Sequence, residues 1–295
     1  MTKKITRRHL KNGLVGFVDL LGFSARVESI RTEQELRALD NDVAFAQNEF
    51  GHKSSDKFTR QSDRAVGKSV LAFSDCLVLS VPLRSPLTPI QGTFDILMSE
   101  LSGFALSQGT CVLEGIFVRG GVDLGIWYRR QDSLISPALV QAYGLERDAC
   151  VPMIAITPRL RRYLSNHPHR RFYSDDIDPI PRTLKQYRKL PNGKTLWFIN
   201  YLRICLDSIE PVIVGEDRKK YLAADADDRD RMRTEAWQKA CLDWAKNHGQ
   251  AILKAHASAE VASVRAKYAW LAKYHNEEVK RFFGKAAKPL SVKPV

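Results

Sequence analysis

Hydrophobic residues form short strand-like runs over the first two thirds of the chain and follow helical spacing over the last third. The run 14–18 is rich in β-branched and aromatic residues, which predicts a buried strand. The run 67–82 predicts one strand, or two strands bent near Asp75. Each run carries a single acid, Asp19 at the end of the first and Asp75 within the second. We therefore expect two lone carboxylates in two core strands.

The remaining segments alternate between strand-like and helix-like patterns. In chain order, we expect a helix over 25–50, a polar loop over 51–66, a helix over 94–106, a strand–turn–strand over 112–127, a helix over 137–149 with proline in its first turn, and strands over 151–157 and 196–202, the last after an Asn192-Gly193 turn. This alternation predicts an α/β or α+β sheet domain over residues 1–210.

The last part of the chain has a different composition. Residues 217–283 are dense in Ala, Lys, Arg, Asp and Glu, and their Trp, Leu and Ile residues are spaced for amphipathic helices. We expect a helical C-terminal extension over residues 211–295.

Length and composition narrow the class of protein. The 295 residues are 44% hydrophobic, which is enough for a substantial core. No signal-peptide pattern follows the basic start, and no uninterrupted apolar run is long enough for a membrane span, so we expect a cytoplasmic protein with no membrane partner. The five cysteines have no CxxC pair and are expected to be reduced.

The net charge of +13 is compatible with two kinds of ligand. A basic nucleic-acid-binding protein is one interpretation, but no RRM, KH or zinc-finger pattern accompanies the charge. The other interpretation is a protein that binds a nucleoside triphosphate, which needs positive potential around its cleft. We expect no nucleic-acid partner.

Two lone acids at strand ends suggest metal chemistry, because a buried carboxylate must be paired, hydrogen-bonded or bound to a metal. Phosphoryl transfer commonly uses two divalent ions about 3.5–4 Å apart. Asp19 and Asp75 suit two Mg²⁺ or Mn²⁺ ions if their strands are neighbours. The turn 20–24 can offer backbone N–H groups to a phosphate and the Leu20 carbonyl to the second ion. Alternatively, each acid caps a turn or pairs with a cation.

These motifs resemble those of a known family. Residues 17–24 (FVDLLGFS) look like the first-metal motif of class III nucleotidyl cyclases, and residues 73–79 (FSDCLVL) resemble their second-metal strand. Residues 118–125 (VRGGVDLG) resemble the segment that follows, with Asp123 where a histidine is common. The resemblance implies metal binding by Asp19, Asp75 and the Leu20 carbonyl. It also implies substrate contacts by the residues near them: Leu21, Gly22, Phe23, Leu71, Phe73 and Arg119.

Two further segments resemble one subgroup of this family. Residues 136–146 (SPALVQAYGLE) and 267–279 (KYAWLAKYHNEEV) are similar to the bacterial pyrimidine cyclases of Pycsar anti-phage defence. Membership would imply a homodimer that converts UTP or CTP to a 3′,5′-cyclic monophosphate and pyrophosphate. A separate effector protein would read this product.

The sequence departs from the purine cyclases at two places. Leu71 stands where those enzymes carry a polar base-reading residue, which fits a pyrimidine pocket, and we lean towards UTP. Val140 and Gly144 stand where they carry an Asn and an Arg. The transition-state cation must then come from elsewhere, and the candidates are Arg119, Arg147 and Lys194.

Other functions stay open from sequence alone. A purine cyclase is one, and a degenerate cyclase-like domain that only binds a nucleotide or a partner is another. A GGDEF-like dinucleotide cyclase is disfavoured, because residues 120–125 (GGVDLG) lack the required acids.

Overall fold

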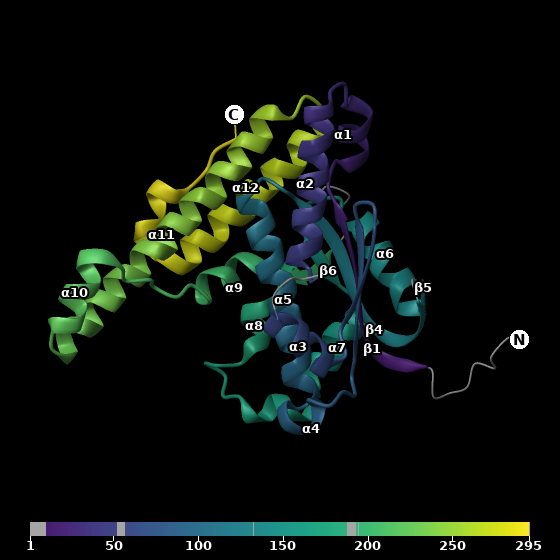
Figure 1. The fold of residues 1–295 in the computed structure, drawn as a ribbon, viewed down its shortest axis with the longest axis horizontal. Helices are drawn as coiled ribbons and strands as arrows, with labels where there is room; N and C mark the ends of the chain where they lie inside the picture. The colour runs from purple at the N-terminus through teal and green to yellow at the C-terminus, as the bar shows by residue number, and fades with distance from the viewer. Residues whose placement is uncertain (1–9, 52–56, 132, 188–192, 194, 295) are drawn as a thin grey trace, which may run out of the picture. The chain divides into compact units, whose positions relative to one another are not determined.

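The computed structural model describes residues 10–51, 57–131, 133–187, 193 and 195–294 (Figure 1). The chain divides into two compact units, Met1–Tyr201 and Leu202–Val295. The fold is a mixed α+β sheet domain with a helical C-terminal part, as expected from the alternating pattern.

The first unit is built on an eight-stranded sheet in the order β2-β3-β1-β4-β6-β8-β7, with β5 paired to β4. All neighbouring strands are antiparallel except β4 and β6. The strands are β1 (Lys11–Leu20), β2 (Ser69–Phe73), β3 (Cys76–Pro82), β4 (Val118–Arg130), β5 (Ser133–Ile135), β6 (Ile154–Ile156), β7 (Leu184–Tyr187) and β8 (Leu196–Ile199).

The two acid-bearing runs are indeed neighbours in this sheet. Strand β1 pairs with β3, and the expected bend at Asp75 is the turn of a β2–β3 hairpin. Ser74 takes a positive φ of 55° there. Asp75 therefore lies in the turn rather than within a core strand, which corrects the expectation of two buried strand acids.

Helices cover both faces of the sheet (Figure 1). On one face, β1 is so close to α5 that a Cβ on Gly16 would lie 2.5 Å from the Phe104 ring. On the other, a Cβ on Gly121 would lie 2.1 Å from the Ala142 carbonyl of α6. The helices of this unit are α1 (Phe23–Ser29), α2 (Glu33–Glu49), α3 (Lys57–Val66), α4 (Thr88–Gln91), α5 (Thr93–Leu113), α6 (Pro137–Ala149), α7 (Pro158–Ser165), η2 (Pro168–Phe172) and α8 (Pro179–Thr183).

Helix α6 has the expected bounds. Ser136 caps it by accepting hydrogen bonds from the Ala138 and Leu139 amides, and proline occupies the first turn. Helix α5 contains the expected helix 94–106 and extends beyond it at both ends.

Two helix and loop predictions were wrong. The expected helix 25–50 is two helices, because Thr32 and Glu35 form a capping box that starts α2. The expected loop 51–66 contains α3, because nothing in KFTRQSDRAV breaks a helix and its Val66 is buried. Polarity was mistaken there for the absence of structure.

The expected strand–turn–strand over 112–127 is one continuous strand, β4, preceded by the end of α5. Gly120 and Gly121 lie inside this strand, where the backbone of β1 and of α6 approaches too closely for a side chain. The glycines thus serve close packing, not a turn.

The later strands are shorter than expected. Strand β6 covers only Ile154–Ile156, and β8 ends at Ile199, after which α9 (Tyr201–Asp207) begins. The Asn192-Gly193 turn falls on residues outside the described ones.

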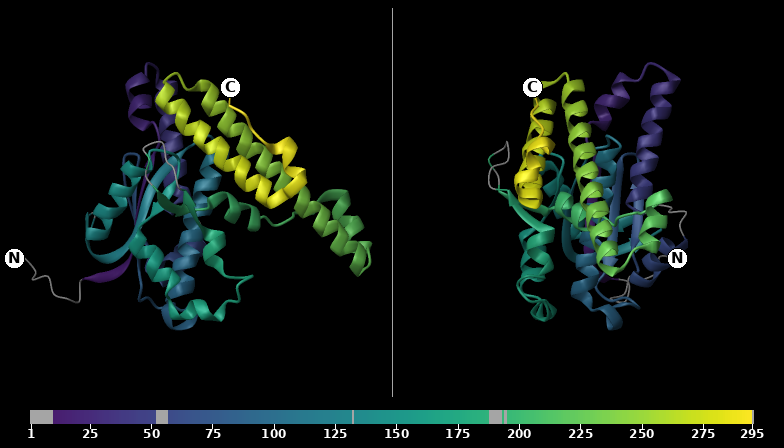
Figure 2. Two further views of the ribbon diagram at one scale, coloured as in Figure 1. Left: turned by 180° about the vertical axis from the view of Figure 1, so that it is seen from behind. Right: turned by 90° about the vertical axis from the view of Figure 1, so that its left-hand side faces the viewer.

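The second unit is helical. It contains α10 (Gly215–Ala223), α11 (Ala226–Ser258), α12 (Ala262–Phe283) and η3 (Gly284–Leu290). Helices α11 and α12 run side by side (Figure 2). Between them the buried rings of His248 and His275 stack, with their Nδ1 atoms 2.9 Å apart.

Helix α5 is the one described helix that is long and apolar enough to cross a membrane by length and composition. Of its apolar window, 61% is buried inside the protein, as in the core helix of a globular domain.

Candidate metal and nucleotide site

Four side chains line up across one end of the sheet. Asp19 on β1 is directly opposite Cys76 on β3 and Arg119 on β4, and Cys76 is opposite Phe73 on β2. Opposite residues of antiparallel strands point to the same face. This face is the one covered by α6, because Phe17, two residues before Asp19, packs edge-on against Tyr143 at 5.2 Å. Sheet register therefore gathers residues that are up to 100 positions apart.

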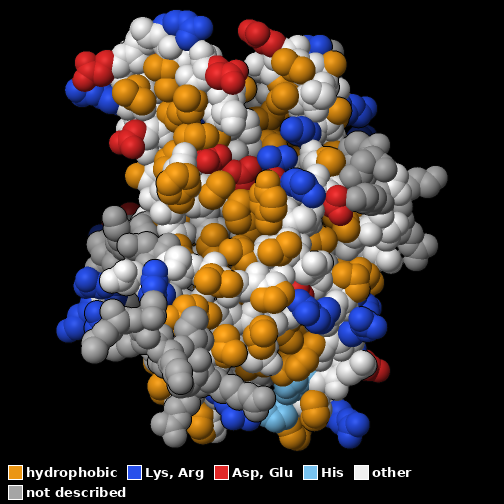
Figure 3. All heavy atoms as spheres, turned by 90° about the vertical axis from the view of Figure 1, so that its right-hand side faces the viewer, with side chains coloured by type: hydrophobic (Ala, Val, Ile, Leu, Met, Phe, Trp, Pro, Cys, Tyr) orange, Lys and Arg blue, Asp and Glu red, His pale blue; other side chains and the backbone are white. Residues whose placement is uncertain are grey.

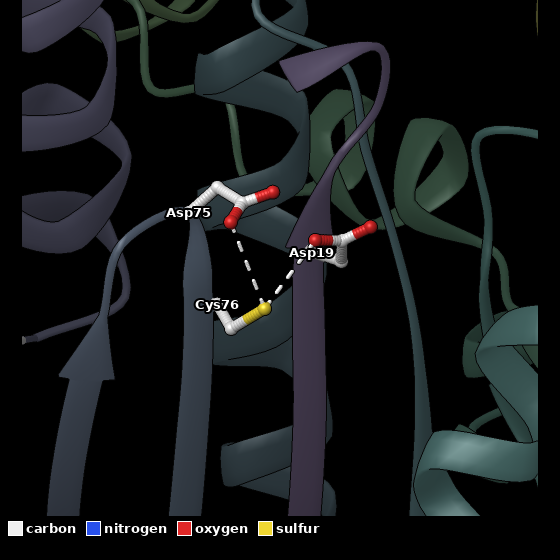
Figure 4. Close-up of side chains that lie close together, drawn as sticks. All are labelled: Asp19, Asp75 and Cys76. Carbon is white, nitrogen blue, oxygen red and sulfur yellow. Dashed lines mark hydrogen bonds between the residues drawn. The ribbon is translucent and has the colours of Figure 1, made fainter. Parts of the chain in front are cut away.

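The two acids meet at this end (Figure 4). Ligand atoms of Asp19, Asp75 and Cys76 all lie within 4.8 Å of one another. The Cys76 thiol points between the carboxylates, with Sγ 3.5 Å from Asp19 Oδ1 and 3.8 Å from Asp75 Oδ1. Carboxylate oxygens are the ligands that Mg²⁺ and Mn²⁺ prefer. The donor set fits a divalent cation.

Electrostatics at the acid pair agree with a cation site. Partial burial and the neighbouring Asp19 carboxylate raise the pKa of Asp75 to about 6. Burial and the same two acids raise the pKa of the Cys76 thiol to about 12. A positive ion between the carboxylates would relieve this repulsion, which makes the pair a candidate site with a physical reason.

Arg119 lies on the other side of Asp19. Its Nη2 and Nε donate to Asp19 Oδ2 at 3.1 and 3.3 Å, and its Nε also forms an ion pair with Glu146 of α6. The side chain is about a quarter exposed. Arg119 is thus the candidate cation that the structure brings to the acid pair.

For the other two candidate cations, Arg147 and Lys194, the structure gives no contact with the acid pair among the described residues. The guanidinium of Arg147 lies over the Tyr143 ring, 5.5 Å from its centroid. Lys194 falls outside the described residues.

The turn after β1 is built around Gly22. Leu20 is buried, so it offers the site only its backbone. The Leu21 amide donates to the Phe117 carbonyl at 2.8 Å, which fixes the start of the turn. This bond uses the only backbone donor of Leu21, which corrects the expectation that its amide contacts a phosphate. Gly22 has a φ of +83°, and a Cβ there would meet only open space. Phe23 then begins α1.

The expected base-contact residues lie on the same face as Asp19. Leu71 is opposite Val78 on β3, and Phe73 is two residues further along β2. Phe73 is 84% exposed, so within one protomer it forms an open surface rather than the floor of a closed pocket. A second surface is needed to enclose a base.

An exposed apolar surface adjoins the site. Figure 3 faces the side on which Figure 1 shows α6 and β5, and hydrophobic side chains gather over the middle of this face, close to acidic and basic ones. Ile135, Val140 and Tyr143 are 67%, 66% and 47% exposed. Ile135 and Val140 also line a hollow of about 600 Å³ between β5 and α6.

Sequence reasoning missed two members of the site. Cys76 is absent from the site residues that the sequence predicts, although its position next to Asp75 is a usable signal. Glu146 is absent from them as well, yet its side chain is only 3% exposed and pairs with Arg119. No local signal links Glu146 to Arg119, because the pair forms only where α6 crosses β4.

Comparison with known proteins gives structural neighbours only. No protein-family model and no curated protein matches the chain. The adenylyl cyclase CyaB from P. aeruginosa matches with a TM-score of 0.43 and 14% identity, over 64% of this chain and 94% of that one. The guanylate cyclase domain of RhGC from Catenaria anguillulae, in complex with GTP, matches with a TM-score of 0.39 and 13% identity, over 64% and 96%.

A bacterial light-regulated adenylyl cyclase matches with a TM-score of 0.37 and 17% identity, over 65% of this chain. The match spans about half of that protein, 52% of its length. TM-scores below 0.5 do not assign a function, so the function proposed below depends on the residues of the site.

Proposed function

We propose that this protein is a metal-dependent nucleotidyl cyclase. The observation that carries the proposal is the convergence of Asp19 and Asp75, with ligand atoms within 4.8 Å, at the open end of the sheet. The glycine turn after Asp19 and the cation Arg119 beside it complete the set of groups that phosphoryl transfer requires.

In the proposed reaction, the ribose 3′-oxygen of a nucleoside triphosphate attacks the α-phosphorus, and pyrophosphate leaves. Bound Mg²⁺ or Mn²⁺ ions, two per site, would supply the charge that activates the 3′-hydroxyl and neutralises the phosphates. Asp19, Asp75 and the Leu20 carbonyl would hold the ions. The amides at Gly22 and Phe23 would face the phosphates, while Leu21, whose amide is bonded to the Phe117 carbonyl, would only hold the turn in place. Arg119 would balance charge on the phosphoryl group.

We extend the proposal to pyrimidine substrates. Leu71 and Phe73 offer a base apolar contact without hydrogen bonds, so the polar edges of a purine would be left unpaired. A buried unpaired group costs about 1–3 kcal/mol, or roughly ten- to hundredfold in discrimination. Among pyrimidines we favour UTP, because the acid near Leu71 in the sequence, Asp75, is assigned to the metal and is not available to accept the cytosine amino group.

We also propose a homodimer that acts in the cytoplasm. A second protomer seated on the apolar surface of β5 and α6 would cover Ile135 and Val140 and could enclose the base near Phe73. The resemblance to Pycsar cyclases supports a role in anti-phage defence, with a cyclic pyrimidine nucleotide read by a separate effector.

The test is incubation of the purified protein with each of the four ribonucleoside triphosphates and Mn²⁺ or Mg²⁺, followed by chromatography against cyclic standards. We expect cyclic UMP and pyrophosphate in equal amounts. Asp19→Asn and Asp75→Asn should each lower the rate at least a hundredfold, because each removes a ligand charge.

Several outcomes would correct the proposal. Equal turnover of ATP or GTP would refute the pyrimidine assignment, and preference for CTP would refute only uracil. Near-normal turnover in either Asn variant would refute the metal assignment. If none of the four triphosphates gives a cyclic product, the cyclase assignment is refuted, and the alternative is a degenerate domain that only binds a nucleotide or a partner.

A further inference from the structure

Glu146 is a buried acid that the metal site does not use directly. It lies on α6, its side chain is 3% exposed, and it forms an ion pair with Arg119 Nε. Arg119 Nη2 in turn donates to Asp19 Oδ2 at 3.1 Å. The three residues form a continuous chain of charges from α6 to the candidate metal ligand.

We propose that Glu146 is a positioning residue that holds Arg119 at the phosphate side of the site. This inference rests on the proposed function and names a residue for its mechanism. Glu146 would hold one edge of the guanidinium. When a bound cation replaces Arg119 as the counter-charge of Asp19, the remaining donors of Arg119 would face the phosphate groups.

The two acids that share Arg119 differ in burial. The side chain of Asp19 is 13% exposed, whereas that of Glu146 is 3% exposed. A buried carboxylate is costly unless it stays paired, so loss of the guanidinium would cost Glu146 more than it would cost Asp19. Asp19 can release the guanidinium, because a divalent ion would replace Arg119 as its counter-charge. The ion pair that survives cation binding is therefore the one with Glu146.

Arg119 keeps donors for a ligand in this arrangement. Its hydrogen bonds to Asp19 use Nε and Nη2, and its contact with Glu146 uses Nε. Within the described part of the chain, Nη1 has no hydrogen-bond partner. A guanidinium held along one edge presents the other in a fixed direction, which suits a phosphate oxygen.

The backbone around the pair is rigid. Gly121, two residues after Arg119 on β4, lies so close to α6 that a Cβ on it would be 2.1 Å from the Ala142 carbonyl. Ala142 lies one helical turn before Glu146. The separation of helix and strand is therefore fixed by contact, and the length of the Glu146 side chain sets the position of Arg119. Both Glu146→Gln, which removes the charge, and Glu146→Asp, which shortens the reach, should release Arg119.

The experiment is a double-mutant cycle read by ligand binding. The full chain is titrated with pyrophosphate in the presence of saturating Mn²⁺, and the dissociation constant is measured by calorimetry. We expect Glu146→Gln to weaken binding about tenfold in the wild-type background. In an Arg119→Gln background it should have no further effect, because Glu146 acts only through Arg119.

A purely structural role for Glu146 would give a different result. The same weakening in both backgrounds, or no weakening in the wild-type background, would overturn the proposal. If the double variant does not fold, the Glu146→Asp variant is measured instead, because it keeps the charge and shortens the side chain. An unchanged pyrophosphate affinity in this variant would also overturn the proposal.

Asp123 provides a matched control. It is a fully buried acid on the same strand, paired with Arg159 and Thr157 away from the acid pair. Asp123→Asn should lower the thermal midpoint but leave the pyrophosphate dissociation constant within twofold. Coupled loss of binding in the Glu146 cycle, without cyclic product from any triphosphate, would support this inference while refuting the cyclase function.

Discussion

At the residue scale, the closeness of Asp19 and Asp75 lowers the stability of the metal-free fold near neutral pH but provides ligands for a cation. The pKa of Asp75 is raised from its ordinary value of 3.8 to about 6, mainly by burial and by Asp19. A carboxyl whose folded pKa is raised stabilises the fold below its unfolded pKa and loses that contribution as pH rises towards 6. With a chelator at pH 7.5, we expect Asp75→Asn to melt at or above the wild-type temperature. Mn²⁺ should raise the melting temperature of the wild type by several degrees and of Asp75→Asn hardly at all.

Differential scanning calorimetry between pH 4 and 8 measures both effects. Asp40→Asn, which changes an exposed acid on α2, should respond to Mn²⁺ like the wild type. A Mn²⁺ response in Asp75→Asn equal to that of the wild type would contradict the cation site.

At the element scale, the contact of α6 with β4 depends on glycine. A Cβ on Gly121 would lie 2.1 Å from the Ala142 carbonyl, a backbone atom that cannot move without the helix. We expect Gly121→Ala to destabilise the protein by about 1–3 kcal/mol, as overpacking does. Because α6 carries Glu146, this variant should also weaken the hold on Arg119. Urea denaturation measures the first effect and the rate of cyclic product the second.

Gly103 on α5 is the matched control, since a Cβ there meets nothing within 4 Å. Gly103→Ala should stabilise by about 0.5–1 kcal/mol, because alanine loses less conformational entropy in a helix. Equal stability of the two variants would show that α6 is not in tight contact with β4.

At the scale of the whole molecule, the exposed surface of β5 and α6 predicts self-association. Val140 is 66% exposed on α6, and Ile135 lies beside it on β5. We expect Val140→Glu to shift the sedimentation profile at micromolar concentration from dimer to monomer and to remove most activity, because a buried unpaired charge is costly.

Ile90 on α4 is 79% exposed and serves as the control position. Ile90→Glu should leave both sedimentation and activity unchanged. A wild-type protein that sediments as a monomer while fully active would exclude a composite site.

Much of the fold followed from the sequence alone. The apolar runs that end in Asp19 and surround Asp75 predicted strands, and Pro137 in the first turn predicted the start of α6. These signals are local, because strand content and helix caps depend on residues a few positions apart. The chemistry of two lone acids in apolar surroundings was equally visible.

What only the tertiary structure decided depends on pairing over long distances. Register placed Cys76 and Arg119 on either side of Asp19, and close packing turned Gly120 and Gly121 from an expected turn into the middle of β4. The partner of Glu146 likewise appears only where α6 crosses that strand. In the sequence, a glycine pair in a turn cannot be distinguished from one at a close backbone contact. A shift of the strand pairing by one residue moves every side chain of that strand to the other face of the sheet. The sequence therefore determined which residues carry charge and chemistry, while strand register and helix packing determined which of them meet.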